Sequence, residues 1–177
     1  MPAPAPIVVT ALIGPEALAL ADGLRRAHYP ADRNQLPAHL TLFHHLPPSA
    51  IEELRRLLAA QARSVPRPAA RVTRLIALGQ GVALGVDSPG LAAIRADIAE
   101  AMRGLLTPQD QAAWRAHITI QNKVAPSAAR ALLQALRPDF RPRPIMLAGL
   151  ALHWYRAGSW ESIADYRFSR SGPARRS

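Results

Sequence analysis

An internal repeat is the feature that most restricts how this chain can fold. Residues 38–58 read AHLTLFHHLPPSAIEELRRLL and residues 116–136 read AHITIQNKVAPSAARALLQAL, so the second segment follows the first by 78 positions without a gap. Convergent strand-then-helix patterns explain shared apolar positions, but they do not require His and Thr at equivalent places. We therefore interpret the repeat as a duplication. The identical pairs are Ala38/Ala116, His39/His117, Thr41/Thr119, Pro48/Pro126, Ser49/Ser127, Ala50/Ala128, Leu54/Leu132 and Leu58/Leu136.

The flanks of the repeat predict the same order of elements in both halves. Each half begins with a strand and an amphipathic helix, continues through the repeated strand and a second helix, and ends with another strand. Ser49 and Ser127 stand where N-caps of the second helices are expected. The predicted strands are 7–13, 69–78, 81–86, 144–155 and 160–168, and the predicted second helices are 50–62 and 128–137.

These elements predict an α+β fold in a single domain over residues 1–177. The halves, roughly 5–78 and 79–168, are each β-α-β-α-β and are expected to form two lobes related by a pseudo-twofold axis. Two sheets would line a central cleft, with the helices outside. Residues 169–177 are a basic tail. A monomer is the default expectation.

Composition narrows the class of protein. Hydrophobic residues make up 49% of the 177 residues and charged residues 19%, which is typical of a folded domain. No apolar run approaches the ~18–20 residues of a membrane helix. No basic segment precedes the first apolar stretch, as it would in a secretory signal. We therefore expect a cytoplasmic protein without a membrane partner. The absence of cysteine excludes disulfides, thiolate nucleophiles and cysteine-bound metals. The net charge of +10 favours anionic partners such as nucleic acid or nucleotides.

The repeated strands place histidine and threonine on one face. Successive side chains of a strand point to opposite faces. The two leucines of the motif HLTL therefore share the buried face, while His39 and Thr41 share the other. The two isoleucines of HITI are likewise buried, while His117 and Thr119 face the opposite way. Paired lobes would bring both polar faces to one cleft.

Two histidines with two threonines suit attack on a phosphodiester. One neutral imidazole removes a proton from the nucleophile while the other, protonated, supplies a proton to the leaving oxygen. Histidine is the side chain whose ordinary pKa is close enough to neutrality for both roles. The threonine hydroxyls, aided by a cation, would donate hydrogen bonds to the phosphoryl oxygens on which charge develops. This chemistry requires no metal and no cofactor, and we expect neither.

The motifs His39-Leu40-Thr41-Leu42 and His117-Ile118-Thr119-Ile120 resemble the paired His-x-Thr-x motifs of the 2H phosphoesterase superfamily, especially bacterial proteins of the 2′-5′ RNA ligase family. Motif spacing, element order and length extend the resemblance to nearly the whole chain. It implies a bilobal fold with a central cleft and metal-independent chemistry on 2′,3′-cyclic phosphates or 2′-5′ linkages. It also implies that the two histidines are the general acid and base and that the two threonines bind phosphate.

Four further residues are predicted to contact the substrate. Lys123, the sole lysine, shares the face of the second motif and fits either phosphate binding or a solvated strand end. His45 is its repeat mate. Arg115, two residues before the second motif, would attract the phosphate or lie in a loop. Phe43 would either stack on a base or fill the interface between the lobes. The alternation turns His44 away from the cleft, which disfavours a zinc site that includes it.

Other aromatic and histidine residues are interpreted as structural. Trp154, Tyr155 and Trp160 cluster near the C-terminus and are expected to pack in the core, with one of them bordering the cleft. His28 and His153 have no partner pattern in the sequence.

The sequence therefore predicts a metal-independent phosphodiesterase that opens a 2′,3′-cyclic phosphate, or a related 2′-5′ linkage, of a nucleotide or an RNA end. Two alternatives stay open. A 2′-5′ RNA ligase would use the same residues with a ribose hydroxyl in place of water. An RNA-binding module with little catalysis would use the basic charge alone. The pattern does not distinguish which histidine is the acid.

Overall fold

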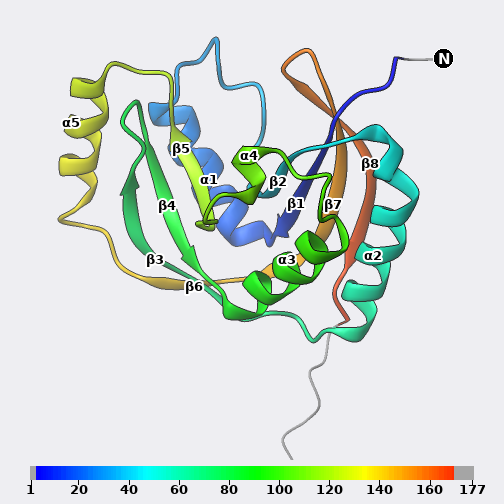
Figure 1. Cartoon of the computed structure of the whole chain (residues 1–177). Helices are drawn as coiled ribbons and strands as arrows, with labels where there is room; N and C mark the ends of the chain where they lie inside the picture. Colours follow the sequence, from blue (N-terminus) through cyan, green and yellow to red (C-terminus); the bar gives the residue numbers. More distant parts are fainter. Residues whose placement is uncertain (1–2, 170–177) are drawn as a thin grey trace, which may run out of the picture.

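The computed structural model describes residues 3–169, which form an α+β fold (Figure 1). The basic tail expected at 169–177 lies, except for its first residue, outside the described residues. The predicted strands and the two repeated helices are confirmed to within a few residues, with the strand expected at 144–155 divided into two. The strands are β1 (Ile7–Ile13), β2 (Leu40–Leu46), β3 (Ala70–Ala77), β4 (Val82–Asp87), β5 (His117–Gln121), β6 (Arg143–Ile145), β7 (Leu147–Arg156) and β8 (Ser159–Arg167). The helices are α1 (Pro15–His28), α2 (Ile51–Ser64), α3 (Pro89–Ala101), α4 (Pro108–Gln111) and α5 (Pro126–Leu136).

The strands form one continuous antiparallel sheet in the order β6-β3-β4-β5-β2-β1-β7-β8. The expectation of two separate sheets is therefore wrong. The two central strands, β2 and β5, are paired at a single position, Leu40 with Ile118, so the sheet is nearly divided into two four-stranded parts. Figure 1 shows these parts as two curved walls on either side of the junction. The junction pairs two residues that are equivalent in the sequence repeat.

The two parts of the sheet do not coincide with the two sequence halves. Strand β3 closes the first half of the sequence but pairs with β4 and β6 of the second. Strand β7 lies in the second half of the sequence but pairs with β1 of the first. The first half thus gives β3 to the opposite part of the sheet and the second half gives β7 and β8, and this exchange ties the two parts together. The duplication with its pseudo-twofold axis stays a prediction.

Apolar residues of the two motifs form the core beneath the junction. Leu40, Leu42, Ile118 and Ile120 are all at most 1% exposed, which confirms the predicted buried faces. Burial of each such side chain contributes about 1.5–3 kcal/mol, so the motif strands are held firmly from the face opposite the histidines. The helical partners in this core include Leu54, Leu58, Leu91, Ile94 and Ile98.

The two repeated helices do not begin as expected, because neither Ser49 nor Ser127 caps its helix. A 3-10 turn, Pro48–Ala50, leads into α2, and the N-cap of α5 is Ala125. Proline at the first helical position, as at Pro126, fixes a helical φ and lacks an N–H that would need a cap. The serine that follows is then already inside the helix.

Strand β2 departs from regular alternation after its motif. Its pairing with β1 changes register twice between Thr41 and Leu46, which is the signature of β-bulges. Phe43 is consequently fully buried in the core, so the expectation that it lies on the cleft face is wrong. His44 and His45 are both exposed side by side. Alternation with a period of two residues does not reveal from the sequence where a bulge adds an extra residue to one strand.

Candidate active site

The two motif histidines are held in the same way on either side of the sheet junction. The Nδ1 atom of His39 lies 2.8 Å from the carbonyl oxygen of Pro37, and that of His117 lies 2.7 Å from the carbonyl oxygen of Arg115. A carbonyl can only accept, so Nδ1–H is the donor in each case. This fixes the tautomer, and it leaves Nε2 of each imidazole as the nitrogen able to take or give a proton.

The threonine of each motif lies next to the histidine of the other motif. Antiparallel pairing of Leu40 with Ile118 places His39 next to Thr119 along the junction, and Thr41 next to His117. His39 and Thr119 also line one cavity, which agrees with the first of these pairs. Both threonines are half-buried. The junction therefore presents two imidazoles and two hydroxyls on one face of the sheet.

An aromatic stack covers His39. The ring centroid of Trp160, at the start of β8, lies 4.5 Å from that of His39 and 5.2 Å from that of His153 in β7. The other side of this stack is fixed by Thr10 of β1, whose Oγ1 lies 3.1 Å from Nε2 of His153. Of the three C-terminal aromatic residues, Trp160 is thus the one that packs against His39. No local pattern indicated a partner for His153, because the residues it contacts are far away along the chain.

The environment of the first histidine favours its neutral form. Burial lowers the pKa of His39 to about 4, and the positive charges of Arg25, His153 and His117 lower it further, against the opposing effect of the Pro37 carbonyl. Burial also lowers the pKa of His153. His39 is therefore unprotonated at neutral pH in the unliganded protein.

A cavity of about 260 Å³ opens beside His39 and Thr119. Its lining includes Lys123, together with two arginines that the sequence analysis did not single out. Arg25 is a buried cation on the inner face of α1, one turn after buried Ala21, and a charge at such a position was the available signal. Arg33 lies in the loop that follows α1. The remaining lining residues are Tyr29, Gln35, Leu36, Asn122 and Gly158.

Three other predicted residues are placed away from this cavity. The exposed side chain of Arg115 lines a separate hollow beside Trp114, and it is the backbone carbonyl of Arg115 that holds His117. His45 is exposed and donates its backbone N–H to Asp110, 3.0 Å away. Phe43 is in the core, where the guanidinium of Arg95 lies over its ring.

The bulged segment of β2 is anchored by a buried carboxylate. Asp110 of α4 is 2% exposed and accepts hydrogen bonds from the backbone N–H groups of His44 and His45 and from Nδ1 of His44. Burial by itself raises the pKa of Asp110, but these hydrogen bonds outweigh it and hold that pKa below its ordinary value. Arg95 of α3 donates to the carbonyls of Leu42 and Asp110 and so joins the same network. The network fixes the strand that carries His39 and Thr41.

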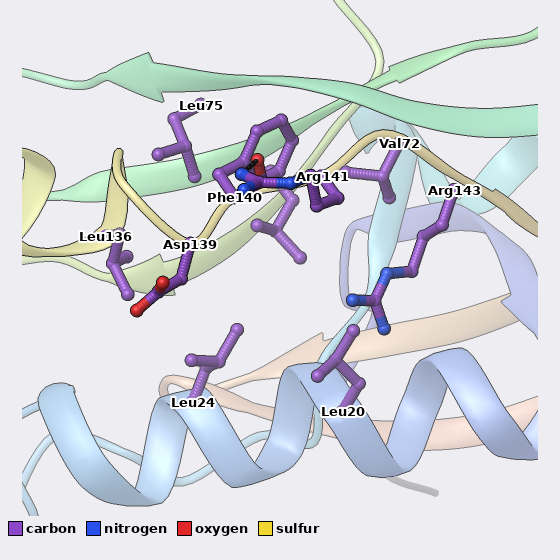
Figure 2. A pocket seen from close by; sticks show the side chains of 10 residues that line it. Leu20, Leu24, Val72, Leu75, Leu136, Asp139, Phe140, Arg141 and Arg143 are labelled. Carbon is purple, nitrogen blue, oxygen red and sulfur yellow. Dashed lines mark hydrogen bonds between the residues drawn. The ribbon is translucent and has the colours of Figure 1, made fainter.

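Figure 2 shows a second cavity, of about 130 Å³, between α1 and the segment that joins α5 to β6. Leu20 and Leu24 project from α1 towards the apolar side chains opposite, and Asp139, Arg141 and Arg143 are its charged residues. Its lining contains no histidine and no hydroxyl side chain. It therefore contains none of the histidine and threonine side chains of the two motifs.

Among residues 3–169, no group of three or more His, Asp or Glu side chains is arranged to hold a metal ion. None of the helices described is both long and apolar enough to span a bilayer.

Solved structures with the same fold cover almost the whole chain. TT0787 of Thermus thermophilus is 15% identical with a TM-score of 0.66, and the alignment covers 94% of this chain and 100% of that one. LigT of E. coli, solved in complex with 3′-AMP, is 13% identical with a TM-score of 0.60, covering 95% of this chain and 100% of LigT. A structure described as a phosphoesterase is 16% identical with a TM-score of 0.60, covering 95% and 100%. The comparison with curated proteins gave no match.

The sequence itself identifies the family. Residues 14–159, which include both His-x-Thr-x motifs, match the 2′-5′ RNA ligase superfamily. This family consists of enzymes of the phosphoesterase and ligase type. The match covers most of the chain and agrees with the fold of the solved structures. The chain therefore belongs to the 2′-5′ RNA ligase superfamily of 2H phosphoesterases.

Proposed function

We propose that this protein is a phosphodiesterase that opens a 2′,3′-cyclic phosphate, or a related 2′-5′ linkage, of a nucleotide or an RNA end. One observation carries the proposal: the two motif imidazoles are held alike by their Nδ1 atoms across a shared strand junction, so that two Nε2 atoms are free for proton transfer. Such a pair is what acid–base cleavage of a phosphodiester needs. Cleavage by this pair requires no metal or cofactor.

The lowered pKa of His39 supports a division of labour between the histidines. His39 is neutral at pH 7, the form required of the base, and its Nε2 accepts the proton of the attacking water. The water oxygen bonds to phosphorus while the bond from phosphorus to one ribose oxygen breaks. Nε2 of His117 gives its proton to that leaving oxygen. The product is a 2′- or 3′-phosphomonoester, and both histidines then exchange protons with solvent.

The two motif threonines stabilise the charge that develops on the phosphoryl oxygens. Thr119 lies beside His39 in the cavity, and Thr41 is its counterpart beside His117. Their hydroxyls donate to the non-bridging oxygens on which this charge develops. Removal of one such donor typically costs about 10²–10³-fold in rate.

The test is turnover of the four nucleoside 2′,3′-cyclic phosphates in the presence of EDTA, with the product isomer identified. We expect EDTA-resistant hydrolysis, and the isomer shows which ribose oxygen leaves. The matched control is His28→Asn, which alters a histidine outside the site and should leave the rate unchanged. Absence of turnover on all four nucleotides and on an RNA with a cyclic phosphate end would refute the proposal.

Ligation is the second candidate, and the family match favours keeping it. A ribose 5′-hydroxyl replaces water as the nucleophile and the same two histidines transfer the protons. Incubation with two RNA fragments, one ending in a cyclic phosphate and the other beginning with a 5′-hydroxyl, separates the reactions, since only ligation lengthens the RNA. A binding module without catalysis would instead retain salt-sensitive RNA affinity after both histidines are replaced.

A further inference from the structure

The cavity beside His39 is lined by more positive charge than one phosphate needs. Arg25, Arg33 and Lys123 all contribute to its lining, and no carboxylate does. Arg33 faces Asp32 only at 3.7 Å, in a pair in which both side chains are mostly exposed. Such a pair contributes little, so the charge of Arg33 remains available to a ligand.

Arg25 is the most informative of the three cations because it is 3% exposed. Its Nε donates to Oδ1 of Asn34 at 3.0 Å and its Nη1 to the carbonyl oxygen of Thr119 at 2.9 Å, and its Cζ lies 4.3 Å from the ring centroid of Tyr29. None of these partners is a carboxylate. Burial lowers the pKa of Arg25, against the opposing effects of Tyr29 and Asp22. A buried cation that is not bonded to an anion is costly, and an anion in the cavity would offset that cost.

Lys123 is held at the cavity by an unusual backbone conformation. Its φ is 60°, in the left-handed region that side-chain-bearing residues seldom adopt. The backbone N–H of Lys123 donates to Oδ1 of Asn122, 2.8 Å away, which stabilises this turn. Strain of this kind persists at sites where a side chain must be presented in one direction.

The reacting phosphate does not account for this cavity. That phosphate has to lie between the imidazoles of His39 and His117, but neither His117 nor Thr41 contributes to the cavity lining. The cavity therefore extends from the junction to one side, on the flank of His39 and Thr119. A ligand that reaches from the junction into it places a second group among the cations.

We propose that this cavity binds a second anionic group of the substrate, so that the preferred substrate is a cyclic phosphate carried by a 5′-phosphorylated nucleotide or by an RNA end rather than by a bare nucleoside. This inference rests on the proposed function, which supplies the position of the first phosphate. In an RNA the second group is the phosphodiester on the 5′ oxygen of the terminal nucleotide.

The test compares equilibrium binding of adenosine 2′-phosphate and adenosine 2′,5′-bisphosphate, neither of which the reaction consumes. The wild-type protein should bind the bisphosphate about tenfold more tightly, the effect of one charge-assisted hydrogen bond. In Arg33→Ala/Lys123→Ala this preference should fall to about twofold or less. Arg26→Ala/Arg130→Ala removes the same charge from exposed positions outside the cavity and should keep the preference.

Three results would overturn the inference: no preference in the wild-type protein, an equal loss of affinity for both ligands in the cavity variant, or the same loss of preference in the control variant. These results are independent of turnover. A preference that disappears in the cavity variant supports the anion site even if the cyclic phosphates are not hydrolysed, in which case only the proposed reaction fails.

Discussion

Replacing Trp160 with alanine should raise the pKa of His39. The indole lies 4.5 Å from the imidazole and helps to bury it, and burial is the largest of the effects that lower this pKa from 6.5 to about 4. That difference corresponds to about 3 kcal/mol against the imidazolium. If the indole provides a third or more of the burial, the pKa in Trp160→Ala rises by at least about 0.8, which is about 1.1 kcal/mol.

The assay is an NMR titration of the imidazole Cε1–H resonances, with His39→Gln used to assign the signal. Tyr155→Ala is the control, because Tyr155 is 44% exposed and lies outside the stack. A wild-type pKa near 6.5, or an unchanged pKa in Trp160→Ala, would refute the argument that the aromatic stack keeps this histidine neutral.

Three further predictions concern stability. Because the pKa of His39 is lowered on folding, its contribution to the free energy of unfolding is complete above pH 6.5 and is lost as the pH falls towards 4. Between pH 7 and pH 4, the free energy of unfolding of the wild-type protein should therefore drop by up to about 3 kcal/mol more than that of His39→Gln. Urea titrations measure both curves, and parallel curves would contradict this prediction. Asp110→Asn should lower the free energy of unfolding by about 2–3 kcal/mol, since two backbone N–H groups and Nδ1 of His44 lose a charged acceptor. The control, Asp97→Asn, loses one exposed hydrogen bond to Gln61 and should change the free energy of unfolding by less than about 0.5 kcal/mol. Equal effects of the two substitutions would contradict the anchoring role of Asp110. Lys123→Gly should raise the free energy of unfolding by about 1 kcal/mol, because glycine adopts the positive φ of this position without strain. Lys123→Ala should not raise the free energy of unfolding. An increase with alanine as well would show that the backbone at position 123 is not strained.

Local sequence pattern was sufficient for the parts of the site that lie within one strand. Alternation placed His39 and Thr41 on the face opposite Leu40, and the burial of Leu40 and Leu42 confirms that assignment. The equivalence of the two motifs also anticipated that both would reach one place. The two motifs meet at the Leu40–Ile118 pair.

Features that depend on pairing between distant segments were not predictable in the same way. Whether β3 joins its own half or the other is decided by packing across the whole sheet, and no local signal specifies it. The bulges of β2 depend on Asp110, which binds the backbone of His44 and His45 from 65 residues or more away, and they turned Phe43 into the core. His153 reached the site through an exchanged strand.

Arg25 was not predicted as a site residue for a different reason. Its position on the inner face of an amphipathic helix was readable from the spacing, but a buried arginine is more often paired structurally than directed at a ligand. Only the combination of its burial, its uncharged partners and the neighbouring cavity distinguishes the two roles.

The central claim, that two histidines share the proton transfers, is tested most directly by kcat/KM on adenosine 2′,3′-cyclic phosphate for the wild-type protein, His39→Asn, His117→Asn and the double variant. Each single substitution should lower kcat/KM by about 10²–10⁴-fold with an unchanged unfolding midpoint at pH 7.5, and the double variant should be little worse than the poorer single variant. A single variant that keeps wild-type kcat/KM would contradict the two-histidine account.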